Sequence, residues 1–270
     1  MEEHLLGITK VVNWLLGKSA AALLAALHIQ PSNPDYPIPN HVSVEILVFA
    51  ISIVFFLWLK GRLSVEQPGS IQQCMEAVLT NPMGVGVRDL LEENAGHQGL
   101  RYVAMLGSIG LFVLFCNLIS LIPGLQSPTA NASVPLGCAL VVFLYYNWVG
   151  LVRHGPLGYG KHFLGPVPAM APIMLPIEVV SHLARVLSLT IRLWVNMLVS
   201  ELLYALFLGL TVALFVFVRH LSAFGYLLAP VPLLVPGIFI LLHIFVGFLQ
   251  AFVFTLLPAI YVGGAVAEEH

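Results

Sequence analysis

Arg192 lies within residues 187–198, an apolar stretch whose composition otherwise suits the middle of a lipid bilayer. A cation at that depth costs about 2.5–3.5 kcal/mol even on insertion scales. An ionisable residue inside a membrane segment is therefore a candidate functional site, and the chemistry that it indicates is the translocation of an ion. The alternative is a structural cation that pairs with a carboxylate on another helix.

Further polar residues interrupt the same apolar C-terminal region. Glu201 follows Arg192 by nine residues, which places the two on opposite faces of an ideal helix, so they cannot form an ion pair along it. His243 and Gln250 are seven residues apart and share a face. Carboxylate, imidazole and amide groups beside water are what a proton path requires, and histidine titrates near neutral pH. Packing is the alternative for His243 and Gln250, because polar side chains also hold membrane helices together.

A polar face is also expected around Arg192 itself. Glu178 precedes Arg192 by fourteen residues, so the two share a helix face. Ser188 and Asn196, each four residues from Arg192, lie on that face as well. This face adds a carboxylate, a hydroxyl and an amide to the candidate ion path.

His182 follows Glu178 by about one helical turn, a spacing that suits half of a metal site. No further ligands accompany the pair, so we expect no metal and no other cofactor. Contact with lipid headgroups is the alternative for His182 and Arg185, because such side chains reach toward the membrane surface. Asn117 and Asn131 are expected to cap helices or close turns.

Composition places the chain among the integral membrane proteins. Of its 270 residues, 59% are hydrophobic and 9% are charged, against about 25% charged in soluble domains. A net charge of −2 gives no reason to expect a nucleic-acid partner. The cysteines, Cys74, Cys116 and Cys138, lack CxxC spacing and are interpreted as packing residues.

The hydropathy pattern predicts an all-α integral membrane protein with about five transmembrane crossings. The last two apolar segments are too long for upright helices, since residues 177–224 would span about 70 Å as a helix and the bilayer core is about 30 Å thick. We expect two long, strongly tilted antiparallel helices connected near residues 219–232. Residues 71–79 and 85–91 are expected to be amphipathic and interfacial. The predicted spans are residues 42–59, 102–121, 134–152, 177–224 and 236–266.

Charge placement divides the chain into three parts. Residues 1–40 are expected to be an N-terminal interfacial, periplasmic segment, and a cleaved signal peptide is the alternative. A signal peptide would start with basic residues, whereas this chain starts Met-Glu-Glu-His. Residues 41–267 are expected to form one transmembrane proton-channel domain, followed by a cytoplasmic tail at residues 268–270. The basic residues between the spans place the C-terminus in the cytoplasm and the N-terminus outside.

Three sequence blocks resemble subunit a of the F-type ATP synthase. The first is residues 176–202, with Ser-Leu-Thr-Ile-Arg-Leu-Trp-Val-Asn-Met around Arg192, and the others are residues 117–131 and 249–257. The resemblance covers about residues 40–265. It implies a non-catalytic stator subunit of a rotary motor, in which two offset aqueous half-channels meet a rotating ring of c subunits.

The resemblance also implies a role for each candidate residue. Arg192 would face the ring and interact with its ion-binding carboxylate. Glu201, His243 and Gln250 would line the half-channel that opens to the outside. Asn196, beside the arginine in sequence, would contribute to the same path.

The half-channel open to the cytoplasm would contain Glu178. The chain departs from the family pattern at three positions: Val195 and Ser200 stand where glycines are usual, and Pro258 stands where serine or threonine is frequent. The side chain of Val195 takes up space on the helix surface beside Arg192, where a glycine would leave it open. Pro258 is expected to kink the last helix. The secondary candidates for proton translocation are His182, Ser188 and Ser200.

The partners that the resemblance implies are the c-ring, the b subunits of the peripheral stalk, other ATP synthase subunits and membrane lipid. The implied location is the bacterial cytoplasmic (inner) membrane. The expected coupling ion is H⁺ rather than Na⁺, although the carboxylate that binds the ion belongs to the c subunit.

Two other classes of function compete with this interpretation. A self-contained secondary cation or proton transporter commonly shows internal repeats with paired broken helices, and the sequence shows no such repeat. An intramembrane hydrolase would need an HExxH motif or a nucleophilic dyad at membrane depth, and the sequence contains neither.

Overall fold

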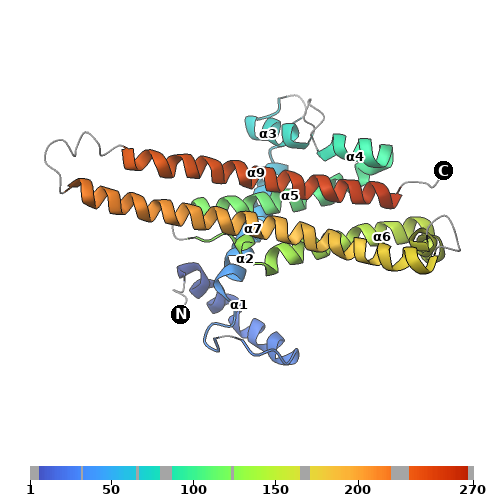
Figure 1. The fold of residues 1–270 in the computed structure, drawn as a ribbon, viewed down its shortest axis with the longest axis horizontal. Coiled ribbons are helices and arrows are strands. Elements are labelled where there is room, and N and C mark those ends of the chain that lie inside the picture. The colour runs from blue at the N-terminus through green and yellow to red at the C-terminus, as the bar shows by residue number, and fades with distance from the viewer. Residues whose placement is uncertain are drawn as a thin grey trace. The chain divides into compact units, whose positions relative to one another are not determined.

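The computed structural model describes residues 6–31, 33–64, 67–79, 87–122, 125–164, 171–219 and 231–266 (Figure 1). Every regular element in these residues is a helix. Five of the helical segments are long and apolar enough to cross a membrane. The predicted all-α multi-pass membrane fold is therefore confirmed.

The shorter helices and spans follow the hydropathy pattern closely. They are α1 (Gly7–Ala26), α2 (Asn40–Lys60), α3 (Ser70–Leu79), α4 (Val87–Ala95), α5 (Val103–Leu118) and α6 (Ser133–Leu164). A 3₁₀ helix of seven residues spans Gly96–Tyr102, and single 3₁₀ turns lie at Ile119–Leu121 and Pro128–Ala130. The predicted first three spans correspond to α2, α5 and α6, and the two predicted amphipathic segments correspond to α3 and α4.

The helix α6 changes direction near its end, beyond the predicted span. Gly155 has a φ angle of 70° inside the helical run, and Pro156 follows it. Only glycine adopts that left-handed backbone readily, so the Gly-Pro pair sets the position of the bend. The apolar span ends at Pro156.

The helix α7 (Ala171–Arg219) contains 49 residues and confirms the prediction of one very long helix. Its predicted start at residue 177 is wrong, because the helix runs through Pro176. Proline lacks the backbone N–H that would bond to the carbonyl four residues earlier. That position lies close to the start of the helix, so only one hydrogen bond is lost and the helix continues.

The last helix, α9 (Val231–Val266), starts five residues before the predicted position and is continuous through Pro258. Pro232 is its second residue, a position where the missing N–H has no intrahelical partner in any case. The predicted connection lies largely in residues 220–230, which fall outside the described residues, as does the predicted tail at 268–270.

The chain divides into two compact units, and several helices contribute to both. Unit 1 comprises Met1–Trp58, Phe115–Asn131 and Met197–Gly247, and unit 2 comprises Leu59–Leu114, Ala132–Asn196 and Phe248–His270. Within unit 1, Ser200 contacts His243, and Phe207 stacks on Phe239 with ring centroids 3.8 Å apart. Phe207 comes later in α7 than Ser200, whereas its partner Phe239 comes earlier in α9 than His243. The two helices are therefore antiparallel, as predicted.

Candidate functional site

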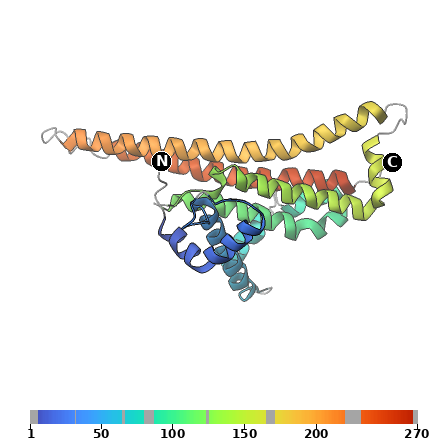
Figure 2. The same ribbon diagram turned by 90° about the horizontal axis from the view of Figure 1, so that it is seen from below.

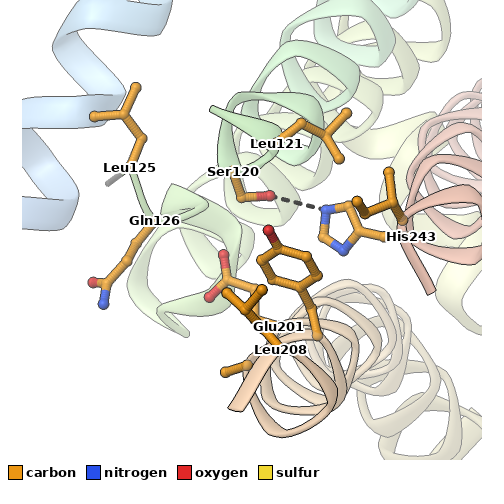
Figure 3. A pocket seen from close by; sticks show the side chains of 10 residues that line it. Ser120, Leu121, Leu125, Gln126, Glu201, Leu208 and His243 are labelled. Atoms are coloured by element: carbon orange, nitrogen blue, oxygen red, sulfur yellow. Dashed lines mark hydrogen bonds between the residues drawn. The ribbon is translucent and has the colours of Figure 1, made fainter. Parts of the chain in front are cut away.

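Unit 1 contains a polar cavity of about 380 Å³ between α7, α9 and the 3₁₀ turn and loop that follow α5 (Figure 3). Glu201, Ser120 and His243 turn their polar ends toward this space. Apolar side chains complete the wall. The polar residues that line the cavity are Ser120, Gln126, Glu201, Tyr204 and His243.

Both ring nitrogens of the buried His243 are occupied. The Ser200 hydroxyl lies 2.6 Å from Nδ1, and the Ser120 hydroxyl lies 2.9 Å from Nε2. The backbone carbonyl of Asn117 lies 3.3 Å from Nε2 and accepts a hydrogen bond from Ser120. Two acceptors at Nε2 favour a proton on that nitrogen, so the Ser200 hydroxyl donates to Nδ1 in the neutral ring.

The serine hydroxyls allow the imidazole to change its charge in place. A hydroxyl donates one hydrogen bond and accepts others. If Nδ1 of His243 gains a proton, the Ser200 oxygen becomes its acceptor after rotation of one bond. The neutral and protonated rings therefore both find partners in the same geometry.

Glu201 is held by the loop that follows α5. The backbone N–H of Ser127 donates to Oε1 of Glu201 over 2.6 Å. The Ser127 hydroxyl lies 2.8 Å from the Cys116 carbonyl and 2.6 Å from the Thr129 hydroxyl. The loop thus presents a fixed backbone donor to the carboxylate.

A buried amide ties this loop to two helices. Asn117 accepts a hydrogen bond from the Thr129 hydroxyl through Oδ1, at 2.7 Å, and donates through Nδ2 to the Gly247 carbonyl, at 3.2 Å. Asn117 and Thr129 are both fully buried. The prediction that Asn117 caps a helix or closes a turn is therefore wrong, since its side chain bonds to groups distant in sequence.

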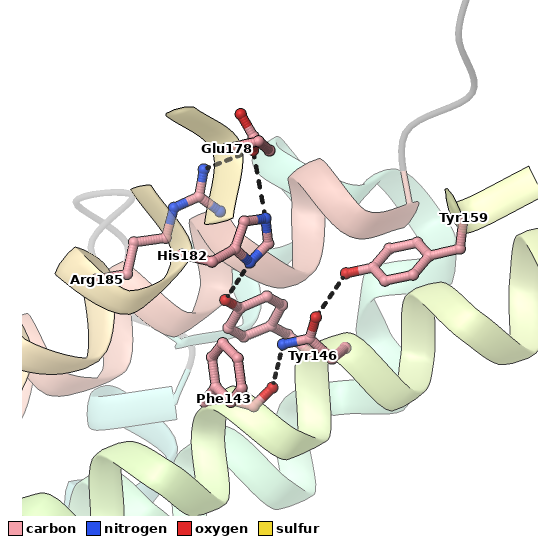
Figure 4. Close-up of polar contacts among 7 residues, drawn as sticks. Phe143, Tyr146, Tyr159, Glu178, His182 and Arg185 are labelled. Atoms are coloured by element: carbon pink, nitrogen blue, oxygen red, sulfur yellow. Dashed lines mark hydrogen bonds and ion pairs between the residues drawn. The ribbon is translucent and has the colours of Figure 1, made fainter. Parts of the chain in front are cut away.

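Unit 2 contains a second polar cavity, of about 250 Å³, lined by α6, α7 and α9 (Figure 4). It too combines a carboxylate, Glu178, with an imidazole, His182. The cavity contains a cation and several phenols in addition. Its polar lining consists of Tyr146, Tyr159, Glu178, His182, Arg185 and Tyr261.

A continuous polar chain runs through this second cavity. Nε2 of His182 lies 3.3 Å from Oε1 of Glu178, and Nδ1 lies 2.8 Å from the hydroxyl of Tyr146. His182 is 7% exposed and Tyr146 is 2% exposed, whereas the Glu178 side chain is 30% exposed. Headgroup contact is therefore the wrong interpretation for His182, because its ring is buried and bonded at both nitrogens.

Arg185 completes the surroundings of Glu178. One of its terminal nitrogens lies 4.0 Å from Oε1 of Glu178. Its guanidinium carbon lies 5.1 Å from the centre of the Tyr261 ring, within the range of a cation–π contact. The arginine thus adds positive charge beside the carboxylate and is held by an aromatic face.

Tyr159 closes the cavity from the part of α6 beyond the bend. Its hydroxyl donates to Oδ1 of Asn147 over 2.9 Å, and Nδ2 of Asn147 donates to the Phe143 carbonyl. Burial raises the pKa of Tyr159 above its ordinary value, and Glu178 raises it further, against an opposing effect of Arg185. The phenol therefore stays protonated and remains a donor throughout the physiological pH range.

Arg192 differs from the cavity residues because its side chain is exposed. Within the part of the chain that the structure describes, no carboxylate pairs with it and no hydrogen bond occupies its guanidinium. Ser188 is also exposed, Asn196 is partly exposed and Gln250 is buried. The alternative of an intrachain structural ion pair for Arg192 finds no partner among the described residues.

Sequence reasoning identified the ionisable residues of both cavities but missed their hydroxyl partners. A serine or tyrosine in an apolar helix is compatible with many environments, so its type alone carries little signal. The block at residues 117–131 was the only sequence feature that drew attention to the loop beside Glu201. The missed residues are Ser120, Ser127, Thr129, Tyr146 and Tyr159.

These features define a class of protein. Long apolar helices that enclose polar cavities, each with a carboxylate and an imidazole, and that carry an exposed arginine, form a multi-pass membrane protein that transports ions. Comparison with known proteins gives the particular family. Residues 42–263 match the family model for the ATP synthase A chain.

Curated relatives agree with that match over nearly the whole chain. The chain is 44% identical to an ATP synthase subunit a of Solibacter usitatus, over 87% of this chain and 90% of the relative. It is 39% identical to ATP synthase subunit a of Koribacter versatilis, over 99% of each chain. The relative from Aquifex aeolicus is 38% identical over 86% of this chain and 99% of its own length. The chain belongs to the ATP synthase A chain family, which confirms the resemblance seen in the sequence.

Proposed function

We propose that the chain is the proton-conducting stator subunit of a rotary ATP synthase and performs no ATP chemistry itself. The observation that carries this proposal is the pairing of a carboxylate with an imidazole in two separate cavities. Glu201 and His243 share one cavity, and Glu178 and His182 share the other. In this proposal, each cavity is the polar end of one half-channel, and Arg192 belongs to the surface that faces the c-ring.

The cavity around Glu201 and His243 is suited to proton uptake. The carboxylate can accept a proton while the Ser127 amide keeps its position. The imidazole has hydroxyl partners on both nitrogens, so it can bind and release a proton without losing its hydrogen bonds. Gln250 is assigned to the same path, as the family resemblance implies.

The cavity around Glu178 is suited to proton release. Tyr146, His182 and Glu178 form an ordered chain of groups that exchange protons, from a buried phenol to a partly exposed carboxylate. Arg185 lies beside Glu178, and Glu178 is the most exposed group of the series, so a proton that reaches its carboxyl group can pass to water. This series of polar groups thus leads from the buried Tyr146 to the partly exposed Glu178.

Arg192 is proposed to separate the two paths. An ionised ring carboxylate is costly in lipid, and a fixed guanidinium attracts and neutralises it. The same positive charge repels protons that would pass directly from one half-channel to the other. Only neutral ring sites then turn into the lipid. Each proton that crosses 100 mV delivers about 2.3 kcal/mol, so several protons are combined for each ATP.

The partners and the location follow from the same assignment. The family membership implies other ATP synthase subunits as partners, and we assign the c-ring and the b subunits to this chain. We place it in a bacterial cytoplasmic membrane, with the N-terminus outside and the C-terminus in the cytoplasm. The coupling ion is H⁺ in this proposal, because imidazole and hydroxyl groups transfer protons readily.

Proton pumping driven by ATP hydrolysis, measured in inverted vesicles that contain the native complex, tests this function. Arg192→Ala is expected to abolish pumping while the complex assembles in normal amounts. Arg192→Lys is the matched variant, since it keeps a charge but loses the planar guanidinium. Normal pumping by Arg192→Ala would contradict the stator assignment. Failure of the c-ring to co-purify with the subunit would favour a self-contained transporter instead.

A further inference from the structure

The helix α1 buries two polar side chains on its inner side and exposes several large apolar side chains on its outer side. Thr9 and Asn13 are buried, with 0% and 9% exposure, whereas Trp14 and Leu15 are 82% and 63% exposed. Val11 is also largely exposed. A helix at the surface of a water-soluble protein has the opposite arrangement. The outer side of α1 therefore suits an apolar environment.

The buried polar side chains attach α1 to the start of a membrane span. Asn13 donates to the Ile38 carbonyl over 2.9 Å and accepts from the Ile38 N–H over 3.0 Å. Thr9 donates to Oδ1 of Asn40 over 2.7 Å. Asn40 is the first residue of α2, the first apolar span. Figures 1 and 2 show α1 beside this end of α2.

Two lysines add positive charge to the exposed face of α1. Lys10, Trp14 and Lys18 follow one another at intervals of four residues and form a stripe along one side of the helix. All three are exposed. Tryptophan prefers the boundary between hydrocarbon and headgroups, and lysine extends its ammonium group toward phosphate while its stem stays in an apolar layer.

We propose that α1 is an interfacial anchor that lies on the bilayer surface where α2 begins and binds anionic phospholipid. The apolar side chains around Trp14 enter the headgroup–acyl boundary, and Lys10 and Lys18 contact lipid phosphates. The Asn13 and Thr9 hydrogen bonds fix the helix to α2, so the anchor sets the depth of that span. This inference stands apart from the proton path and does not depend on it.

Site-directed spin labelling of the assembled complex in lipid nanodiscs tests the position of α1. The native cysteines are first replaced by serine, and a label is placed at Leu15. Val54, exposed within α2, gives the lipid reference, and Asp35, exposed in the linker, gives the water reference. The Leu15 label should collide with oxygen as the Val54 label does and should be shielded from a water-soluble nickel chelate.

The other two outcomes at Leu15 would overturn the proposal. Ready access to the nickel chelate would place α1 in water. Shielding from both oxygen and the chelate would mean that another protein subunit covers the helix. Asn13→Leu provides a second measurement, because loss of both bonds to Ile38 should increase the mobility of the Leu15 label. Unchanged mobility would show that the bonds to Ile38 do not fix the anchor to α2.

The anionic part of the proposal has its own measurement. Lys10→Gln combined with Lys18→Gln should increase the water-exposed population of the Leu15 label by about fivefold or more for each lysine lost, in nanodiscs that contain phosphatidylglycerol. In nanodiscs of phosphatidylcholine alone, the double variant should behave as the unmodified chain does. An equal effect in both lipids, or no effect in either, would remove anionic recognition from the proposal.

Discussion

The backbone N–H of Ser127 donates a hydrogen bond to Oε1 of Glu201 over 2.6 Å, across 74 positions of the chain. A backbone donor cannot be removed by a change of side chain, and it has the same charge at every pH. The carboxylate therefore has one oxygen in a constant position, while the cavity of unit 1 lies beside it. Because the Ser127 N–H holds the side chain in place, a substitution at Glu201 can change its proton binding and leave its position unchanged.

Glu201→Gln is expected to lower ATP-driven proton pumping at least tenfold without loss of assembly. The glutamine carbonyl still accepts the Ser127 N–H, so the geometry is retained, but the group no longer binds and releases a proton. Pumping is measured by quenching of a pH-sensitive dye in inverted vesicles. Glu93→Gln, at an exposed carboxylate of α4, is the matched control and should pump normally. Equal pumping by the two variants would make Glu201 a packing residue.

Ser200→Ala is expected to impair pumping more than Ser120→Ala. Loss of the Ser200 hydroxyl removes the only partner of Nδ1 of His243 among the described residues. Loss of the Ser120 hydroxyl leaves the Asn117 carbonyl at Nε2. A hydrogen bond contributes about 0.5–1.5 kcal/mol, so we expect a difference of up to about tenfold in pumping rate. The reverse order would mean that the Nε2 side carries the proton.

Thr129→Val is expected to destabilise the subunit and reduce pumping. Valine has nearly the same shape but cannot donate to Oδ1 of Asn117, and an unsatisfied buried acceptor costs about 1–3 kcal/mol. Thr129→Ser keeps the hydroxyl and should restore most of both properties. The measurements are thermal stability of the purified complex and the pumping rate. A Thr129→Ser variant as impaired as Thr129→Val would show that loss of the hydroxyl does not explain the effect.

Tyr146→Phe is expected to slow pumping by roughly threefold to tenfold, the range that a single hydrogen bond supports. The change removes the hydroxyl at Nδ1 of His182 and leaves the contact between His182 and Glu178. Tyr145→Phe is the control, because Tyr145 packs edge-on against Tyr102. If both variants pumped equally well, Tyr146 would be removed from the proton path.

Most of the fold could be predicted because the bilayer imposes length and composition on each span. The ranges of α2 and α5 agree with hydropathy within a few residues. The start of α7 could not be predicted from Pro176, since the loss of one hydrogen bond near a helix end is tolerated. The length of α7 was predictable because residues 177–219 contain no proline.

The site was predictable only where charge stands out against an apolar background. Glu201 and His243 were identified in that way. The donor to Glu201 is a backbone amide, which every residue except proline possesses, so the sequence carries no mark of it. The role of Asn117 likewise depends on the Gly247 carbonyl, 130 positions away, and local pattern favours a turn instead.

The two serines at His243 have a consequence for the speed of the proposed proton path. Exposed side-chain rotations take picoseconds to nanoseconds, whereas helix shifts and domain movements take microseconds to milliseconds. Exchange of donor and acceptor roles at Ser200 and Ser120 requires only the rotation of hydroxyl bonds. The hydrogen bonds of the imidazole can thus adapt to either protonation state without the slower movement of a helix. In the proposed mechanism, the supply of protons to the cavity, and not rearrangement of the protein around His243, would then limit how quickly the ring is loaded.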